Sequence, residues 1–414
     1  MMDACVQPGL LPVHEAIVRM LGELAPITAT EIVSLYESLD RVLAEAIVAP
    51  INVPGGDNSA MDGYAVRHQD CGETLTLIGE SFAGHPFKGE LLAGQAVRIM
   101  TGALVPAGAD AVVMQENVTR QEQCIAINQV PDPGENIRRA GEDIAQHAQV
   151  FASGQRVSAL DIGLLSSLGI TQVRVTQRVK IALLTTGDEL LAPGAHYESG
   201  KIYDSNRPLL RALLSRLPVE ILDLGIVPDN PAALRTAFLR AREFADLVVS
   251  TGGVSVGDAD YTKDILAELG EINFWKIAMK PGKPFAFGLL GKNARAGACW
   301  FCGLPGNPVS TAVTYHQLVV PALRFLAGET VSDLPVISAI AAHPLKKQPG
   351  RMDFQRGIFT GVNGINSVAS AGLQSSGVLS SMSNANCYIR LAAERGHVAA
   401  GETVDVILFD QFIR

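Results

Sequence analysis

The strongest constraint on the fold is a long stretch, residues 179–326, in which short apolar runs alternate with helical segments. The runs 180–184 and 247–250 are apolar enough to be buried on both faces, and residues 207–216 and 231–244 have helical patterns. Strands that alternate with helices form a parallel sheet that helices cover on both sides. We therefore expect a three-layer α/β domain in this part of the chain.

The segments on either side have other patterns. We expect helices over residues 11–24, about 30–48 and 158–168. Residues 64–135 and the chain after residue 331 instead show short strand-like runs separated by turns rich in Gly, Pro or Ser. A chain of 414 residues should form two to four domains. The sequence thus predicts an α/β domain accompanied by helical and β-rich parts.

Composition narrows the class of protein. Charged residues make up 18% of the chain and the hydrophobic set 48%, which is typical of a globular protein. The net charge of −9 argues against a general nucleic-acid binder, which needs a basic face. Residues 296–323 lack charged side chains but contain Pro305 and Pro308, so we expect no membrane span there. No secretory signal is visible, and we expect a cytoplasmic protein.

Cys299 and Cys302 form the one CxxC pair among six cysteines. No second Cys or His pair stands at the spacing of a zinc site. Because the pair lies in the apolar run 298–302, we interpret both residues as buried, reduced core cysteines and not as a redox or zinc motif.

Acidic residues follow several predicted strands at their carboxyl ends, where open α/β sheets bind ligands. They are Glu189, Asp229, Asp258 and Asp260, and together their oxygens suit a hard cation such as Mg²⁺. Each carboxylate alone is better explained as a helix cap or a solvated charge. Four of them on successive strand ends favour a metal site.

Two turns at the same edge suit an anion. The Gly-rich turn 252–257 would let backbone N–H groups approach it, and Asn307 followed by Pro308 predicts the start of a helix, whose dipole also favours negative charge. No Walker or dinucleotide fingerprint is present.

Lys276, Lys280 and Lys283 lie within eight residues, interleaved with Trp275 and other large apolar side chains. A solvated charge run is the usual explanation for such a cluster. Here the apolar neighbours favour a partly buried edge that directs ammonium groups at an anion. Carboxylates for a metal and lysines for phosphates are typical of Mg²⁺-dependent handling of phosphorylated substrates.

A further polar loop, residues 57–66, precedes a short strand expected at 64–66. Its carboxylates, amide and hydroxyl either form a site or simply satisfy backbone donors in an Asx-type turn.

Eight strings spread over nearly the whole chain resemble, in order, the sequence blocks of the MoeA family, the molybdopterin molybdenumtransferases that complete molybdenum cofactor synthesis. They are DNSAMDGYAV (57–66), RIMTGA (98–103), RRAGEDI (138–144), TTGDEL (185–190), GKIYDSN (200–206), GGVSVGDADYTK (252–263), FWKIAMKPGKPFAFG (274–288) and LPGNP (304–308).

The resemblance implies a homodimer of four-domain subunits. The expected parts are a helical linker region (1–50 with 145–177), a distal β-rich module (51–144), an α/β domain related to molybdopterin adenylyltransferases (178–328) and a C-terminal β-barrel (329–414).

The reaction implied by the resemblance inserts molybdenum from molybdate into adenylylated molybdopterin with release of AMP. Eight residues match the family's functional positions: Asp57, Thr101, Asp143, Glu189, Asp229, Asp260, Lys276 and Lys280. Of these, Glu189, Asp229 and Asp260 would hold Mg²⁺ and position the adenylyl phosphate, and the lysines would neutralise molybdate and phosphates. Asp57, Thr101 and Asp143 would complete the cleft from the partner subunit.

Further residues are expected to bind the substrates, with Arg351, Ser375 and Ser376 serving the pterin phosphate or molybdate. The remaining members of this set are Asp62, Gly252, Gly253, Ser255, Lys283, Pro305, Gly306 and Asn307. Expected partners are a second copy of the chain, and transiently a molybdopterin adenylyltransferase and molybdoenzyme chaperones.

The sequence departs from the family pattern at two positions. Gly56 stands where relatives usually have a bulky residue, and Lys280 stands where many have Arg, which would give bidentate phosphate geometry. Two other functions stay open: adenylylation of molybdopterin with ATP, and a scaffold that has kept the fold without the chemistry. The additional N-terminal and C-terminal parts argue against the first, and the retained charged constellation argues against the second.

Overall fold

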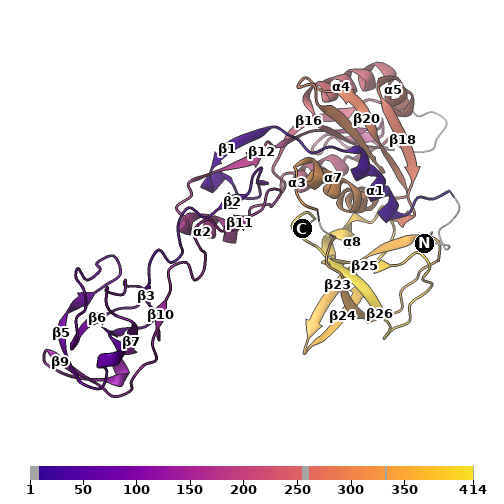
Figure 1. The fold of residues 1–414 in the computed structure, drawn as a ribbon. Helices are drawn as coiled ribbons and strands as arrows, with labels where there is room; N and C mark the ends of the chain where they lie inside the picture. The colour runs from indigo at the N-terminus through magenta and orange to yellow at the C-terminus, as the bar shows by residue number, and fades with distance from the viewer. Residues whose placement is uncertain (1–8, 254–260, 332, 414) are drawn as a thin grey trace. The chain divides into compact units, whose positions relative to one another are not determined.

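The structure is a computed structural model that describes residues 9–253, 261–331 and 333–413, and its chain divides into two compact units (Figure 1). The first unit contains the described residues of Met1–Glu31, Asp40–Val42 and Val175–Arg414. The second unit contains Ile32–Leu39 and Leu43–Arg174. None of the helices in the described ranges combines the length and apolar character that a membrane span requires.

A six-stranded sheet of the first unit confirms the α/β prediction. Its strand order is β16-β13-β17-β21-β20-β18; the first four strands are parallel, and β20 and β18 are antiparallel to their neighbours. The strands are β13 (Val179–Thr186), β16 (Val219–Val227), β17 (Leu247–Thr251), β18 (Glu271–Lys276), β20 (Pro284–Lys292) and β21 (Ala298–Leu304).

Helices cover both faces of this sheet, because alternate side chains of the buried strands point in opposite directions. Ile181 and Leu183 pack into one core together with α1, α3, α6 and α7, whereas Ala182 and Leu184 pack into another core with α4 and α5. The helices are α1 (Val13–Glu23), α3 (Asn206–Leu214), α4 (Pro231–Phe244), α5 (Tyr261–Leu269), α6 (Pro308–Thr314), η4 (Tyr315–Val319) and α7 (Val320–Leu326).

The C-terminal part of the first unit is the expected β-barrel. Strands β23, β24, β22, β26 and β25 pair in this order, and β25 pairs back to β23, which closes the sheet. The elements are β19 (Met279–Lys280), β22 (Ile337–Ala341), β23 (Met352–Val362), β24 (Ile365–Ser370), α8 (Leu379–Asn384), β25 (Cys387–Leu391) and β26 (Thr403–Leu408). The short β19 adds to β23, so Lys280 stands opposite Asp353.

The second unit contains a six-stranded sheet of order β7-β4-β6-β5-β9-β8, as the alternating pattern predicts. Its strands are β4 (Gly63–Val66), β5 (Thr74–Ser81), β6 (Gln95–Ile99), β7 (Ala111–Met114), β8 (Val118–Gln121) and β9 (Cys124–Ile127). The other strands and the α-helix of this part of the chain are β1 (Thr30–Ser34), β2 (Ile47–Val48), β3 (Asn58–Ser59), β10 (Ile137–Arg138), β11 (Gln149–Phe151), α2 (Ala159–Ser167) and β12 (Gln172–Thr176). The four domain boundaries stay a prediction.

The helix predicted over residues 30–48 is wrong. Residues Thr30–Ser34 form strand β1 and Leu35–Glu37 a single 3₁₀ turn. β-Branched residues in the first stretch favour an extended backbone. Further on, the N–H of Leu43 donates to the carbonyl of Gln155 at 2.9 Å, and that of Ala44 to Arg174 at 3.0 Å. Backbone pairing with distant segments therefore replaces the helical hydrogen bonds.

The cysteine prediction is confirmed. Cys299 and Cys302 are free thiols, each fully buried on β21. Burial raises the pKa of Cys299 to about 12 and that of Cys302 still further. Neither is a thiolate at neutral pH, so neither has the reactivity of a redox or metal-binding cysteine.

Gly63→Ala is expected to destabilise the second unit. A Cβ atom at Gly63 would lie 1.9 Å from the carbonyl oxygen of Val113 on the paired strand β7, so β4 and β7 would have to separate. Overpacking of this kind costs about 3 kcal/mol. The loss should appear as a lower melting temperature in calorimetry. The control is Gly72→Ala, because Gly72 has no atom within 4 Å of its Cβ position; equal losses in both variants would contradict the prediction.

Candidate functional site

Three carboxylates gather at the carboxyl ends of β13 and β16. Asp188 and Glu189 follow β13, and Asp229 follows β16; the N–H of Asp229 donates to Asp188 Oδ1 at 3.0 Å. Burial first, and then the charges of Asp188 and Glu189, raise the pKa of Asp229. The group is thus an acidic cluster in which like charges repel, and a cation there would relieve the repulsion.

Near the carboxyl ends of β13 and β17, several buried polar atoms have no hydrogen-bond partner among the described residues. They include the hydroxyls of Thr185, Ser250 and Thr262 and the amide oxygen of Asn206. Buried groups of this kind are normally paired, so such a cluster is suited to a ligand.

Gly252 and Gly253 fit this edge for a steric reason. Both have positive φ, +85° and +64°, and a Cβ atom on Gly252 would lie 2.3 Å from the carbonyl oxygen of Thr186. Glycine therefore allows the backbone to approach β13 closely. Ser255, Asp258 and Asp260, the other residues predicted in this turn, lie outside the described residues.

Asn206 connects the ends of two strands, a role that the sequence analysis missed. Its amide nitrogen donates to Thr251 Oγ1 at 3.0 Å and to the carbonyl of Gly306 at 2.6 Å. The string GKIYDSN, which resembles a family block, ends at Asn206 and is the sequence signal for this role. Asn206 thereby fixes the turn after β21 against the end of β17.

That turn contains the predicted residues Pro305, Gly306 and Asn307. Asn307 occupies the N-cap position of α6, as predicted, but its side chain makes no capping hydrogen bond. Gly306 and Asn307 are exposed, whereas Pro305 is buried and its carbonyl accepts from Thr311 Oγ1 at 2.6 Å. In the N-terminal turn of α6, the N–H of Val309 instead donates to the carbonyl of Ser376 at 3.1 Å.

Lys276, Lys280 and Lys283 are exposed on a segment whose other side chains are largely buried. The N–H of Ile277 donates to the carbonyl of Lys283 at 2.7 Å, which closes a tight turn. Ile277 and Met279 are fully buried. The alternation turns the apolar residues inward and the ammonium groups outward, as the sequence predicts.

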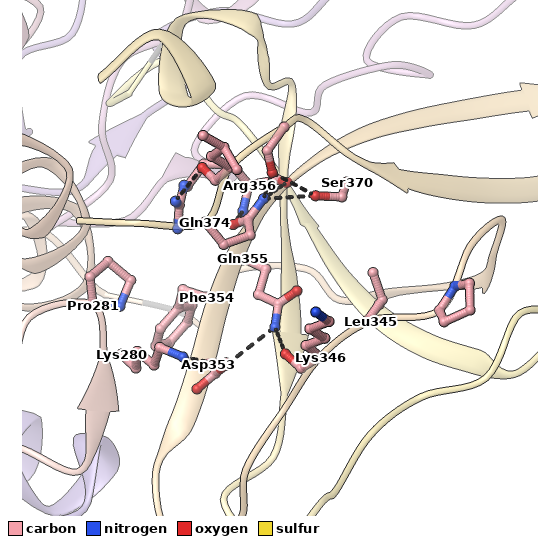
Figure 2. A pocket seen from close by; sticks show the side chains of 13 residues that line it. Lys280, Pro281, Leu345, Lys346, Asp353, Phe354, Gln355, Arg356, Ser370 and Gln374 are labelled. Atoms are coloured by element: carbon pink, nitrogen blue, oxygen red, sulfur yellow. Dashed lines mark hydrogen bonds and ion pairs between the residues drawn. The ribbon is translucent and has the colours of Figure 1, made fainter. Parts of the chain in front are cut away.

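A cavity of about 420 Å³ adjoins Lys280 (Figure 2). Its polar lining comes from β23 and from the loops 344–346 and 370–374. Of the residues predicted to bind pterin phosphate or molybdate, Ser375 is exposed and its carbonyl accepts from the buried Arg356 at 3.1 Å. Arg351 is half-buried, and its carbonyl accepts from Lys347 Nζ at 2.6 Å.

The second unit contains the other predicted residues. Asp62 accepts from both the N–H and the hydroxyl of Thr101, each at 2.8 Å, and these bonds lower the pKa of its carboxyl. Asp57 accepts from the N–H of Ala140 at 2.8 Å and from Arg139 Nη1 at 2.6 Å, which lower the pKa of Asp57 in the same way. Arg139 is a further residue that the sequence analysis missed, although RRAGEDI contains it.

Asp143 is exposed, and its N–H donates to the carbonyl of Val53 at 3.1 Å. At Gly56 a Cβ atom would lie 2.8 Å from Leu104 Cδ2. Leu104 is exposed, so a larger residue at position 56 would require only a shift of the end of this side chain, and nothing in the structure explains the glycine.

The predicted ligands of Mg²⁺ are only partly within the described residues. In the described ranges no three His, Cys, Asp or Glu residues are arranged to hold a metal ion. Glu189 and Asp229 supply hard oxygen donors from one acidic cluster, and Asp260 lies outside the ranges. The chemistry of the two donors fits a hard cation.

Three family models match the chain in succession. The MoeA N-terminal region (domain I and II) matches residues 11–169, a probable molybdopterin binding domain matches residues 182–325, and the MoeA C-terminal region (domain IV) matches residues 338–409.

Similar proteins cover nearly the whole chain. It is 48% identical to a molybdopterin molybdenumtransferase of Haemophilus influenzae, over 98% of this chain and 100% of the relative, and 34% identical to one of Nostoc, over 97% and 93%. The fold is similar to the crystal structure of the molybdopterin biosynthesis MoeA protein of Pyrococcus horikoshii, with a TM-score of 0.83, 30% identity and coverage of 97% of this chain and 100% of that one.

Asp229→Asn is expected to stabilise the fold at neutral pH. The pKa of Asp229 is raised in the folded state, so its ionisation costs stability once the pH rises above the ordinary pKa of an aspartate. Removing the charge should raise the free energy of unfolding by an amount on the order of 0.5 kcal/mol at pH 7, with no gain near pH 3.

The matched control is Asp223→Asn, because Asp223 lies on β16, the strand that Asp229 follows. Burial would raise the pKa of Asp223, but the Gly225 N–H and then Arg211 and Arg207 outweigh it, so that this pKa is lowered. This variant should therefore lose stability at pH 7. Thermal unfolding of both variants across pH checks the pair, and two shifts of the same sign at pH 7 would contradict the assignment.

Proposed function

The chain belongs to the MoeA family, and we propose that it inserts molybdenum from molybdate into adenylylated molybdopterin with release of AMP. The observation that carries the proposal is the segment of Lys276, Lys280 and Lys283, which exposes three ammonium groups in a protein of net charge −9 and whose Lys280 lines a cavity of about 420 Å³. Such a local reversal of charge suits a site for oxyanions and phosphates.

The basic and the acidic residues would have different roles in the reaction. Lys276 and Lys280 would neutralise molybdate and the phosphates, and the turn at Gly252 and Gly253 would offer backbone N–H groups to an anion. The reaction balances when two thiol protons of molybdopterin leave with one molybdate oxygen as water, and one water cleaves the phosphoanhydride to give AMP.

Mg²⁺ belongs to the proposal. Glu189 and Asp229, with Asp260, would hold it, and it would supply charge neutralisation at the adenylyl phosphate. Burial, and then the charges of Asp188 and Glu189, raise the pKa of Asp229, and a bound cation would offset both effects.

We also propose that the protein is a cytoplasmic homodimer whose cleft combines residues of both copies. Asp57, Thr101 and Asp143 would come from the second unit of one subunit, and Lys276, Lys280 and the carboxylate cluster from the first unit of its partner. Asp62 would hold Thr101 in position through its paired hydrogen bonds. Transient contacts with a molybdopterin adenylyltransferase and with molybdoenzyme chaperones would deliver the substrate and receive the product.

AMP release from adenylylated molybdopterin tests the function. Release should require molybdate and Mg²⁺, and Glu189→Gln and Lys276→Ala should each slow it about 100-fold, the usual cost of removing one group that stabilises developing charge. Lys292→Ala is the control, because Lys292 is also an exposed lysine at an end of a strand of the same sheet. ATP consumption with free molybdopterin would instead identify an adenylyltransferase, and a folded dimer with neither activity would identify a scaffold.

Mixing two inactive variants tests the shared cleft. Asp57→Asn and Lys276→Ala homodimers should both be inactive, but exchanged heterodimers contain one cleft with neither substitution. We expect about a quarter of the wild-type AMP release after subunits mix randomly. Mixtures that stay inactive, although light scattering and tagged-subunit capture show exchange, would place both residues in a cleft within one subunit.

A further inference from the structure

The cavity beside Lys280 contains a buried acid that the proposed reaction has not used. Asp353, at the start of β23, lines the cavity together with Lys280, Lys346, Gln355, Arg356 and Gln374 (Figure 2). Its side chain is 3% exposed. Among the described residues, the hydrogen bond recorded for its carboxylate is a long one, from Gln355 Nε2 to Oδ2 at 3.3 Å.

Two ammonium groups lie close to Asp353, but neither forms a tight ion pair with it. Lys280 Nζ lies 3.9 Å from Oδ2, and Lys347 Nζ lies 4.0 Å from Oδ1. Lys347 is fully buried and donates to the carbonyls of Gln348 at 2.9 Å and Arg351 at 2.6 Å. Its protons thus bind the loop that carries Arg351, and Asp353 is left with weak partners.

Charged groups surround Asp353 on several sides, and the exposed Lys346 lines the same cavity. The others are Lys280 on β19, Lys347 and Arg351 on the preceding loop, Arg356 on β23 and, acting on Lys347, Glu394 after β25. Burial outweighs these cations and raises the pKa of Asp353, and burial also lowers the pKa of Lys347. The charged pair is therefore held only loosely in its ionised form.

We propose that an oxyanion binds in this cavity beside Lys280 and that Asp353 takes up one proton from solvent as it binds. An ionised carboxylate would repel a dianion and would compete with it for Lys280. The neutral acid instead donates a hydrogen bond to an oxyanion oxygen and leaves the ammonium of Lys280 to the ligand. The proposal rests on the proposed function for the identity of the oxyanion, molybdate.

Proton uptake makes Asp353 a specificity-determining residue. Molybdate and sulfate have the same charge and tetrahedral shape, but sulfate is the weaker base and accepts a hydrogen bond from a carboxylic acid less well. A site that contains a protonated acid therefore prefers the more basic oxyanion. A fixed amide donor would discriminate less.

Calorimetric titration of the wild-type protein with molybdate, in two buffers of different ionisation enthalpy, measures the proton uptake without any variant. We expect an uptake that approaches one proton per molybdate. The Kd should rise about tenfold per pH unit between the pKa of Asp353 in the free protein and its higher pKa in the complex. No uptake, or no measurable binding of molybdate, would overturn the inference.

Asp353→Asn supplies a permanent donor without a titratable proton. The variant should bind molybdate with a Kd that is independent of pH, tighter than wild type at the alkaline end, and with a smaller preference over sulfate. Asp246→Asn is the matched control, because Asp246 is another buried carboxylate, at the amino end of β17, and accepts from Arg295 and Asn293. Its proton uptake should equal that of wild type. Unchanged uptake in Asp353→Asn would overturn the inference.

Binding and turnover separate the two proposals. Adenylylated molybdopterin is absent from the titrations, so proton-coupled binding without molybdate-dependent AMP release would remove the proposed function alone. AMP release together with pH-independent molybdate binding would remove the role of Asp353 alone.

Discussion

The short segment from Lys276 to Phe285 is the constraint on which the site of the first unit depends. Three hydrogen bonds hold it to two other parts of the unit: the N–H of Leu11 donates to the carbonyl of Lys276 at 2.8 Å, the N–H of Ala278 donates to the carbonyl of Leu11 at 2.7 Å, and the N–H of Met352 donates to the carbonyl of Ala278 at 2.8 Å. Because the backbone is held on both sides, its apolar side chains must point into the core. The lysines between them are therefore turned outward and exposed.

Charge is separated across this site at a cost in stability. Carboxylates gather at the ends of β13 and β16, where burial and then the neighbouring charges raise the pKa of Asp229. The lysines lie on the segment that joins the sheet to the barrel. Neither group neutralises the other in the described contacts, and Lys280 reaches only the buried Asp353. Sites that keep like charges together without partners are typical of function, since stability alone would select against them.

Local patterns in the sequence predicted the elements of the first unit but not the contacts of the site. Buried strands and amphipathic helices are encoded by residues near one another, so β13, β17 and α4 could be placed from sequence. The segment 30–48 could not, because its backbone partners, Gln155 and Arg174, lie more than a hundred residues away. Asn206, Arg139 and Asp353 were missed for the same reason: each acquires its role from a partner that only the tertiary fold brings near.

The register between β19 and β23 gives a physical meaning to the lysine at position 280. An arginine opposite Asp353 would form two parallel hydrogen bonds with the carboxylate, a geometry that favours the ionised acid and occupies both partners. The lysine is a point charge, and at 3.9 Å it attracts the carboxylate without satisfying its oxygens. Burial then decides the protonation of Asp353, and the ammonium stays available to an arriving anion. Lys280, where many relatives have Arg, and the buried Asp353 therefore act together. A substitution at either position should change the effect that a substitution at the other has on oxyanion binding.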